Sequence, residues 1–305
     1  MTGAYDWGVD VVLWFQRFSP ALDLPFKLVT FMGDEPFFLI LLPLIYWCFD
    51  RRTGVRLTVL FLASAYVNAV VKEIFAQPRP FQYDARVRPI VMESGFGFPS
   101  GHTQGAAVVW GYLAWRLRRP WAWVAAVLLV LLIPLSRIYL GVHFPTDLLG
   151  GYLIGAALLA AYIGLAPRVE AWFAEKGIRY QLLASVIAPG LMILAYPGEG
   201  RYGVATGAAL MGMSLGFALE RRWVGFLEGG PWFKRALRLV LGLVVMTVIY
   251  IGLKIVLAGL RPESLFRFFR YLLVGLWGGF GAPWLFVRAN LASRQPGHTS
   301  SGSAG

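Results

Sequence analysis

The chain is predicted to be an all-α, polytopic membrane protein, a bundle of about nine transmembrane helices. Hydrophobic residues make up 58% of it and charged residues only 14%, about half the charged fraction of an ordinary soluble domain. Apolar runs recur along the chain, and short arginine clusters fall between them. This combination is typical of helices that cross a bilayer in succession and are joined by basic loops.

The N-terminal stretch from Trp7 to Leu28 is amphipathic and carries Pro20 and Pro25. We expect it to be interrupted at the prolines and to lie along the membrane surface, so residues 1–34 form an interfacial N-terminal segment. No cationic stretch opens the chain, which argues against a cleaved signal peptide.

Nine apolar runs follow, and each predicts a spanning helix. Several are shorter than the roughly 20 residues of an upright span, so tilted helices or a thinned bilayer are expected. The runs are Phe37–Phe49, Val55–Ile74, His102–Leu117, Trp121–Tyr139, Thr146–Gly164, Gln181–Ala195, Gly203–Leu219, Ala236–Leu257 and Tyr271–Val287. No polar linker divides them. Residues 35–196 are assigned to a catalytic core of five to six helices, residues 197–292 to additional helices, and residues 293–305 to a disordered or appended tail.

The distribution of basic loops predicts the orientation. With the N-terminus outside, the loops around Arg51, Arg118 and Arg221 all lie on the inner side, as the positive-inside rule requires. The formal charge of +12 is therefore explained by anionic lipid headgroups, and nucleic-acid binding is not expected. The expected location is the inner (plasma) membrane of a bacterium.

In this topology one set of polar residues falls on the extracytoplasmic side, at the ends of four helices. Its members are Lys72, Arg79, Ser100, Gly101, His102, Arg137, His143 and Asp147. Three cations in one place suit a phosphate dianion, because a lysine and two planar guanidinium groups match its oxygens. The turn before His102 adds backbone N–H donors at a helix start, where the helix dipole also favours an anion. Ser100 can donate a further hydrogen bond or cap that helix.

The two histidines suit nucleophilic and acid–base chemistry on that phosphate. His143 and Asp147 are four residues apart, a spacing that can place the carboxylate beside one ring nitrogen and leave the other nitrogen free to attack phosphorus. His102 would then protonate the leaving oxygen and later activate water. The acidic residues are few and scattered, and Cys48 is the single cysteine. We therefore expect turnover without a metal or another cofactor.

These residues form a three-part pattern that resembles the type 2 phosphatidic acid phosphatase (PAP2) superfamily. Its parts are Lys72-x6-Arg79-Pro80, Pro99-Ser100-Gly101-His102 and Ser136-Arg137-x5-His143-x3-Asp147. The resemblance implies an integral-membrane lipid phosphatase with a phosphohistidine on His143, His102 as acid and base, and Lys72, Arg79, Ser100, Gly101 and Arg137 around the phosphoryl group. It covers roughly Phe37 to Gly164, and the nine-span layout with an external N-terminus is similar to the glucose-6-phosphatase branch.

Three functions stay open on the sequence alone. The first is hydrolysis of a lipid phosphate or pyrophosphate, of the phosphatidate or polyprenyl type. The second uses the same phosphohistidine on a soluble phosphomonoester such as glucose 6-phosphate, or transfers the phosphoryl group to an alcohol. The third, a transporter or scramblase, is disfavoured because transporters place polar residues near the bilayer midplane. The sequence does not determine the oligomeric state.

Overall fold

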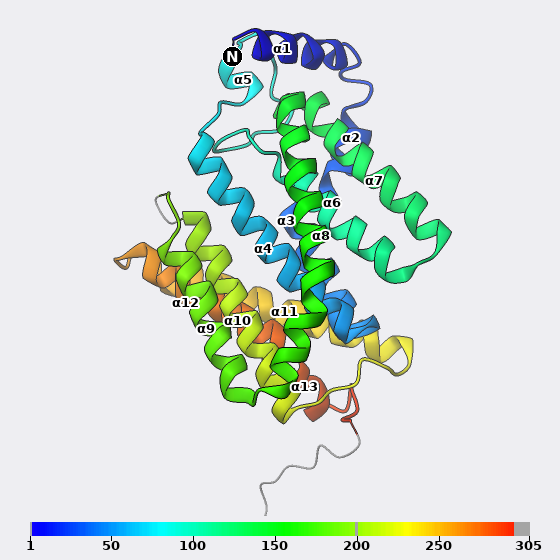
Figure 1. Cartoon of the computed structure of the whole chain (residues 1–305), viewed down its shortest axis with the longest axis vertical. Helices are drawn as coiled ribbons and strands as arrows, with labels where there is room; N and C mark the ends of the chain where they lie inside the picture. Colours follow the sequence, from blue (N-terminus) through cyan, green and yellow to red (C-terminus); the bar gives the residue numbers. More distant parts are fainter. Residues whose placement is uncertain (1, 199–200, 296–305) are drawn as a thin grey trace, which may run out of the picture. The chain divides into compact units, whose positions relative to one another are not determined.

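The computed structural model describes residues 2–198 and 201–295, and every regular element within them is a helix (Figure 1). The β-type pairing found among these residues is an isolated bridge between Phe226 and Arg294. The all-α prediction is therefore confirmed for the described part of the chain. Most of the predicted tail, from residue 296 onward, lies outside the described residues.

The helices follow the apolar runs closely. In chain order they are α1 Thr2–Gln16, α2 Asp23–Phe31, α3 Glu35–Leu44, the π-helix η1 Ile45–Phe49, α4 Arg51–Phe75, α5 Pro80–Tyr83, α6 Gly101–Leu117, α7 Pro120–Tyr139, α8 Pro145–Glu175, α9 Ile178–Leu194, α10 Arg201–Trp223, α11 Trp232–Val256, α12 Glu263–Leu276, the π-helix η2 Trp277–Gly281 and α13 Ala282–Arg288. Each of the nine predicted runs coincides with one helix or with a consecutive set of helices.

Fewer than nine of these helices are long and apolar enough to qualify as spans by themselves. Five do so among the described residues: Arg51–Tyr83, Pro120–Tyr139, Pro145–Glu175, Tyr202–Trp223 and Trp232–Val256. A sixth arises if Asp23–Phe31 and Glu35–Phe49, bent by 45° at the break between them, are one crossing. The count of nine is thus not confirmed, because α6 and α9 have only 17 residues each and the last run is divided among α12, η2 and α13.

The N-terminal segment was expected to be interrupted at Pro20 and at Pro25, and its two helices, α1 and α2, are separated at Pro20 alone. The break between α1 and α2 includes Pro20, as expected, but Pro25 lies inside α2 and does not interrupt it. Pro25 is in the first turn of that helix, where no backbone N–H is needed for an intrahelical bond. The expectation that Pro25 breaks the segment was therefore wrong.

The chain divides into two compact units that interleave along the sequence. The first comprises Met1–Leu39 and Ser64–Leu165, and the second comprises Ile40–Ala63 and Ala166–Gly305. In the first unit, α8 packs closely on α6 because Gly151 and Gly155 face it without side chains. A Cβ on Gly151 would lie 2.7 Å from the Ser100 carbonyl oxygen, and one on Gly155 would lie 3.0 Å from that of Gln104. This close approach brings the start of α6 beside the start of α8.

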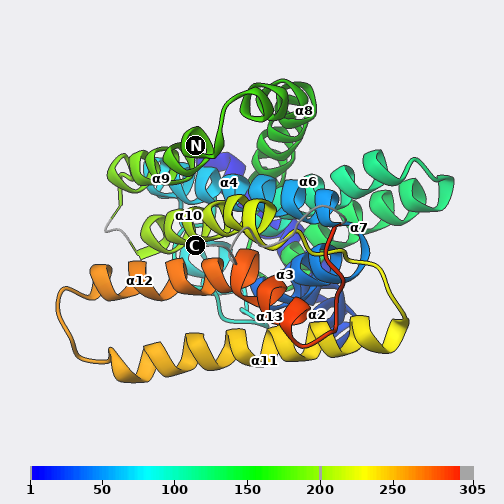
Figure 2. The same cartoon turned by 90° about the horizontal axis from the view of Figure 1, so that it is seen from below.

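Glycines also set the packing of the second unit, where α10 lies against α9 and α12, and α11 runs beside α12 (Figure 2). A Cβ on Gly212 of α10 would lie 2.2 Å from the Leu272 carbonyl oxygen of α12. One on Gly216 would lie 2.8 Å from the Gly279 Cα in η2. These contacts are backbone to backbone, so small residues are required there.

Replacing Gly212 by alanine is expected to destabilise the protein by about 1–3 kcal/mol, because the new methyl group has no room and the α12 backbone must move. Gly252 of α11 is the matched control, since nothing lies within 4 Å of a Cβ built there. Gly252→Ala should leave stability unchanged or raise it slightly, because alanine has the higher helix propensity. Thermal unfolding in detergent measures both variants, and equal melting temperatures would contradict this packing.

Candidate active site

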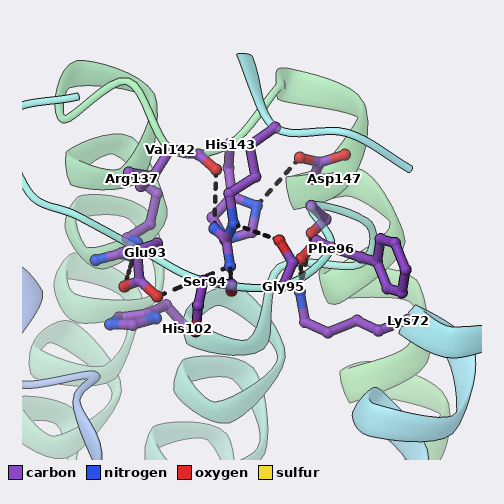
Figure 3. A network of polar contacts seen from close by, with 12 residues as sticks. Lys72, Glu93, Ser94, Gly95, Phe96, His102, Arg137, Val142, His143 and Asp147 are labelled. Carbon is purple, nitrogen blue, oxygen red and sulfur yellow. Dashed lines mark hydrogen bonds and ion pairs between the residues drawn. The ribbon is translucent and has the colours of Figure 1, made fainter. Parts of the chain in front are cut away.

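The eight residues selected from the sequence all lie in the first unit, and five of them, Lys72, Gly101, His102, Arg137 and Asp147, lie in the first or last turn of a helix. Lys72 is in the last turn of α4 and Arg137 in the last turn of α7. Gly101 begins α6, and Asp147 is in the first turn of α8. Figure 3 shows that Lys72, His102, Arg137, His143 and Asp147 are gathered around one loop. The spacing along the chain is large, so only the helix arrangement brings them together.

His143 and Asp147 form the pair that the four-residue spacing predicts. His143 Nδ1 lies 3.1 Å from Asp147 Oδ2, and the same oxygen accepts the Phe144 backbone N–H at 2.9 Å. A carboxylate only accepts hydrogen bonds, so Nδ1 carries the proton and Nε2 keeps its lone pair. Burial, with the neighbouring cations Lys72 and Arg79, holds the pKa of His143 well below its usual value of 6.5. The imidazole is neutral at physiological pH, as a nucleophile must be.

Arg79 is buried, with 4% of its surface exposed, and its guanidinium group lies beside the free nitrogen of His143. Nη1 is 3.4 Å from His143 Nε2 and donates to the Val142 carbonyl at 3.1 Å. Nε and Nη2 donate to the carbonyls of Gly95 and Ser94 at 3.0 and 2.9 Å. Every nitrogen of this guanidinium group therefore points at a carbonyl oxygen or at the imidazole.

Lys72 contacts the same loop from the opposite side. Its Nζ donates to the carbonyls of Phe96 and Gly97 at 2.6 and 3.1 Å (Figure 3). Gly97 has to be a glycine here, because a Cβ would lie 2.9 Å from the Pro78 carbonyl oxygen and 3.1 Å from Asp147 Oδ2. The loop thereby passes between the lysine and the His143–Asp147 pair, and its carbonyl oxygens solvate the cations.

Glu93 is a site residue that the sequence reasoning missed. Its carboxylate forms an ion pair with Arg137 Nη2 and lies 3.8 Å from Arg79 Nη2. Burial would raise the pKa of Glu93, but the charge and hydrogen bond of Arg137 hold it below its usual range, so the group is ionised. Its position shortly before the Pro-Ser-Gly-His turn could have indicated a place in the site. The sequence reasoning instead used the scattered acidic residues only to argue against a metal site.

The Glu93–Gly97 loop thus supplies one carboxylate and four carbonyl oxygens to Lys72, Arg79 and Arg137. Buried cations are stable only with such partners. A bound phosphoryl group offers the same chemistry, since its oxygens accept charge-assisted hydrogen bonds from lysine and arginine. Each of the three cations has at least one oxygen partner in this loop, and it can exchange that partner for an oxygen of a substrate.

Ser100 acts as the cap of α6. Its hydroxyl accepts the Thr103 backbone N–H at 3.3 Å, and its own N–H donates to the Asp147 carbonyl at 2.9 Å. Ser100 therefore ties the start of α6 to the start of α8, so the positive ends of two helix dipoles face the site. Gly101 follows it in close contact with α4, because a Cβ there would lie 3.2 Å from Asn68 Oδ1.

A buried polar network beneath the turn was also not anticipated. Asn68 Nδ2 donates to Gln104 Oε1 at 2.9 Å and lies 3.3 Å from the Pro99 carbonyl oxygen. Gln104 Nε2 in turn donates to the carbonyl and hydroxyl oxygens of Ser64, both at 2.8 Å. Asn68 is one helical turn before Lys72, so this network sets the position of the lysine relative to α6.

His102 makes its polar contact with Asp34, whose Oδ1 lies 2.7 Å from Nε2. Figure 3 places the ring beside Glu93 and Arg137. Within residues 2–198 and 201–295, no three side chains of the metal-binding types His, Cys, Asp and Glu gather at one point. Turnover without a metal stays a prediction, which activity in the presence of a chelator can test.

Comparison with known proteins shows the family of the chain. The family model of the PAP2 superfamily matches residues 53–170. Phosphatidylglycerophosphatase B of Bacillus subtilis is 32% identical over 155 residues, which cover 47% of this chain and 74% of that protein. The chain belongs to the PAP2 superfamily. A second model, the transmembrane extension of PAP2 superfamily phosphatases, matches residues 204–294.

Two further similarities describe the range of the superfamily around this chain. Mouse glucose-6-phosphatase 3 is 31% identical over 176 residues, which cover 50% of this chain and 51% of that protein. The crystal structure of a transmembrane PAP2-type phosphatidylglycerophosphate phosphatase from Bacillus subtilis is 26% identical, covers 55% of this chain and 89% of that one, and has a TM-score of 0.47. The two family models, the Bacillus relative and the five apolar helices of spanning length together support a multi-pass membrane phosphatase of the PAP2 type.

Glu93→Gln is expected to lower the free energy of unfolding by about 2–4 kcal/mol, because it removes the counter-charge of the buried Arg137. Added inorganic phosphate should then raise the melting temperature of this variant more than that of the unchanged protein, since the anion replaces the lost charge. The exposed Glu175, changed to glutamine, controls for net charge. Equal phosphate-induced shifts in all three proteins would show that Glu93 does not share a site with phosphate.

Proposed function

We propose that this PAP2 phosphatase hydrolyses a lipid phosphate or lipid pyrophosphate, of the phosphatidate or polyprenyl type, through a phosphohistidine on His143. One observation carries the proposal. The free nitrogen of a neutral, carboxylate-oriented imidazole lies 3.4 Å from Arg79. Lys72 and Arg137 contact the same short loop as Arg79. A nucleophile next to three cations is the arrangement that phosphoryl transfer requires.

In the first step His143 Nε2 attacks phosphorus, a P–N bond forms and the ester P–O bond breaks. Protonated His102 gives its proton to the leaving oxygen, so the alcohol departs neutral. Asp147 accepts the hydrogen bond from His143 Nδ1–H, which stays protonated, and stabilises the positive charge that develops on the ring. In the second step His102 takes a proton from water, whose oxygen attacks phosphorus. The P–N bond breaks, and inorganic phosphate leaves.

The three cations hold the phosphoryl oxygens during both steps. Lys72, Arg79 and Arg137 exchange the oxygens of the Glu93–Gly97 loop for those of the substrate, and the Gly101 end of α6 adds the favourable end of a helix dipole. Ser100 then acts through that helix as its cap. The charge of a metaphosphate-like transition state is spread over three equatorial oxygens, which matches three separate cations.

A lipid is the favoured substrate because exposed apolar residues are next to site residues along the chain. Ile74 and Phe75, beside Lys72 in sequence, are 64% and 54% exposed, and Met92, next to Glu93, is 79% exposed. A soluble sugar phosphate would gain nothing from such neighbours, whereas an acyl or prenyl chain can contact them. The Bacillus relative is named for a phosphorylated lipid. The similarity to mouse glucose-6-phosphatase 3 supports a soluble phosphomonoester as the second candidate substrate.

We further propose nine crossings, with α6, α9 and the α12–η2–α13 run as short or tilted spans. The N-terminus and the active site would then lie on the extracytoplasmic side of a bacterial inner membrane. Residues 1–34 would lie along the surface of that membrane. The positive-inside distribution of arginines supports this orientation. Cysteine accessibility on either side of the membrane tests it directly.

His143→Ala is expected to abolish turnover and covalent labelling by a phosphorus-32 substrate, because the attacking nitrogen is gone. His102→Ala should keep weak activity only with aryl phosphates, whose leaving groups need no proton, and lose about 10²–10⁴-fold with alkyl esters. Rapid acid quenching of purified protein detects the phosphoenzyme. Near-normal rates in His143→Ala would remove His143 as the nucleophile.

Phosphatidate and polyprenyl phosphates are expected to be turned over with a kcat/KM at least about tenfold above that of glucose 6-phosphate, because the lipid chain adds apolar contact. A competition assay in mixed micelles, with phosphate release as the readout and an added alcohol as an alternative acceptor, measures this preference. Preferred hydrolysis of glucose 6-phosphate would favour the second candidate, and a phosphorylated alcohol would indicate transferase activity.

A further inference from the structure

The bend between α2 and α3 contacts the active site from outside the region that the PAP2 model matches. Helix α2 ends at Phe31 and α3 begins at Glu35, and the chain bends by 45° between them. The PAP2 model starts at residue 53 and the three sequence motifs start at Lys72, so neither includes this bend. We refer to Thr30, Gly33 and Asp34 together as the α2–α3 elbow.

Asp34 provides the first contact of the elbow. Its Oδ1 lies 2.7 Å from His102 Nε2, a distance that makes a strong hydrogen bond between a carboxylate and an imidazole. Because the carboxylate accepts, the Nε2 proton is committed to Asp34. Nδ1 is the nitrogen left to exchange a proton with a substrate oxygen.

Gly33 provides the second contact, which is steric and independent of the hydrogen bond. A Cβ at this position would lie 2.7 Å from His102 Cδ2 and 2.9 Å from Ile133 Cγ2. The backbone of the elbow therefore packs directly on the imidazole ring. A glycine allows this approach, and a larger residue would push the ring away from its present orientation.

Thr30 provides the third contact, to a different member of the site. Its hydroxyl accepts from Arg137 Nη1 at 2.6 Å, while Nη2 of the same guanidinium binds Glu93. Thr30 is 5% exposed and Arg137 is 1% exposed, so water does not compete for this bond. One short segment thus orients both a proposed acid–base residue and a proposed phosphate ligand.

We propose that the α2–α3 elbow is a fourth part of the catalytic apparatus, in which Asp34 is the positioning residue of His102 and Thr30 that of Arg137. Asp34 orients the ring and stabilises the imidazolium that donates to the leaving oxygen, as Asp147 does for His143. The inference rests on the proposed role of His102 as the general acid. It gives each histidine of the site a carboxylate partner from a different helix boundary.

The test compares substrates with good and poor leaving groups. Asp34→Asn keeps the shape of the side chain but removes the charge, so kcat/KM for an alkyl phosphate should fall by about 10²-fold or more. For 4-nitrophenyl phosphate, whose leaving group needs no proton, it should fall less than about tenfold. Gly33→Ala should show the same selective loss through displacement of the ring.

Asp23→Asn is the matched control. Asp23 begins α2, the helix that leads into the elbow, and accepts a hydrogen bond from Tyr139 Oη at 2.6 Å, but it contacts neither histidine nor phosphate ligand. It should leave both rates nearly unchanged. Melting temperatures of all variants in detergent separate loss of fold from loss of function, and the ratio of the two rates does not depend on the folded fraction.

The outcomes distinguish the inference from the proposed function. Equal losses on both substrates in Asp34→Asn and Gly33→Ala would overturn the elbow as a positioning element and leave it as packing. If His102→Ala keeps alkyl phosphate activity, the acid assignment itself fails. If His102→Ala shows the selective loss and Asp34→Asn does not, only the inference fails.

Discussion

The site depends on keeping three cations close together in a buried place. Arg79 and Arg137 are almost fully covered, and an unpaired charge in such a position is strongly destabilising. The Glu93–Gly97 loop removes that cost with one carboxylate and four carbonyl oxygens. These partners hold the cations in place but bind them with the same kind of oxygen that a phosphate carries. The three cations are therefore gathered and paired within the protein itself, and under the proposed function a phosphate dianion replaces the loop contacts.

Helix ends carry the rest of the geometry. Glycines on α8 let α6 approach until Ser100 bonds to the Asp147 backbone, which places two helix starts at one point. The Asn68–Gln104 pair ties α4 to the same place. Side chains on rigid helix ends lose little freedom when a substrate binds, and this preorganisation is the main contribution that a protein makes to phosphoryl transfer. The second unit has its own close glycine packing between α10 and α12.

The histidines differ in the source of their carboxylates. Asp147 is four residues from His143, whereas Asp34 is 68 residues from His102 and comes from the bend between α2 and α3. A short spacing is visible in the chain, but a pair across 68 residues is not. His143 and Asp147 both lie in the region that the PAP2 model matches, whereas Asp34 lies outside it. The Asp34–His102 contact connects the N-terminal segment directly to the candidate site.

The helical class, the positions of the nine apolar runs and the His143–Asp147 contact followed from the chain alone, because periodicity, hydrophobicity and short spacing are local properties. The span count did not, since short and broken helices meet no simple length criterion. Only the folded structure identified four further residues of the site, Glu93, Asp34, Thr30 and Asn68. Each of them contacts a residue at least 31 positions away along the chain. An isolated polar residue carries no mark of its partner, and only the packing of helices shows which charge it faces.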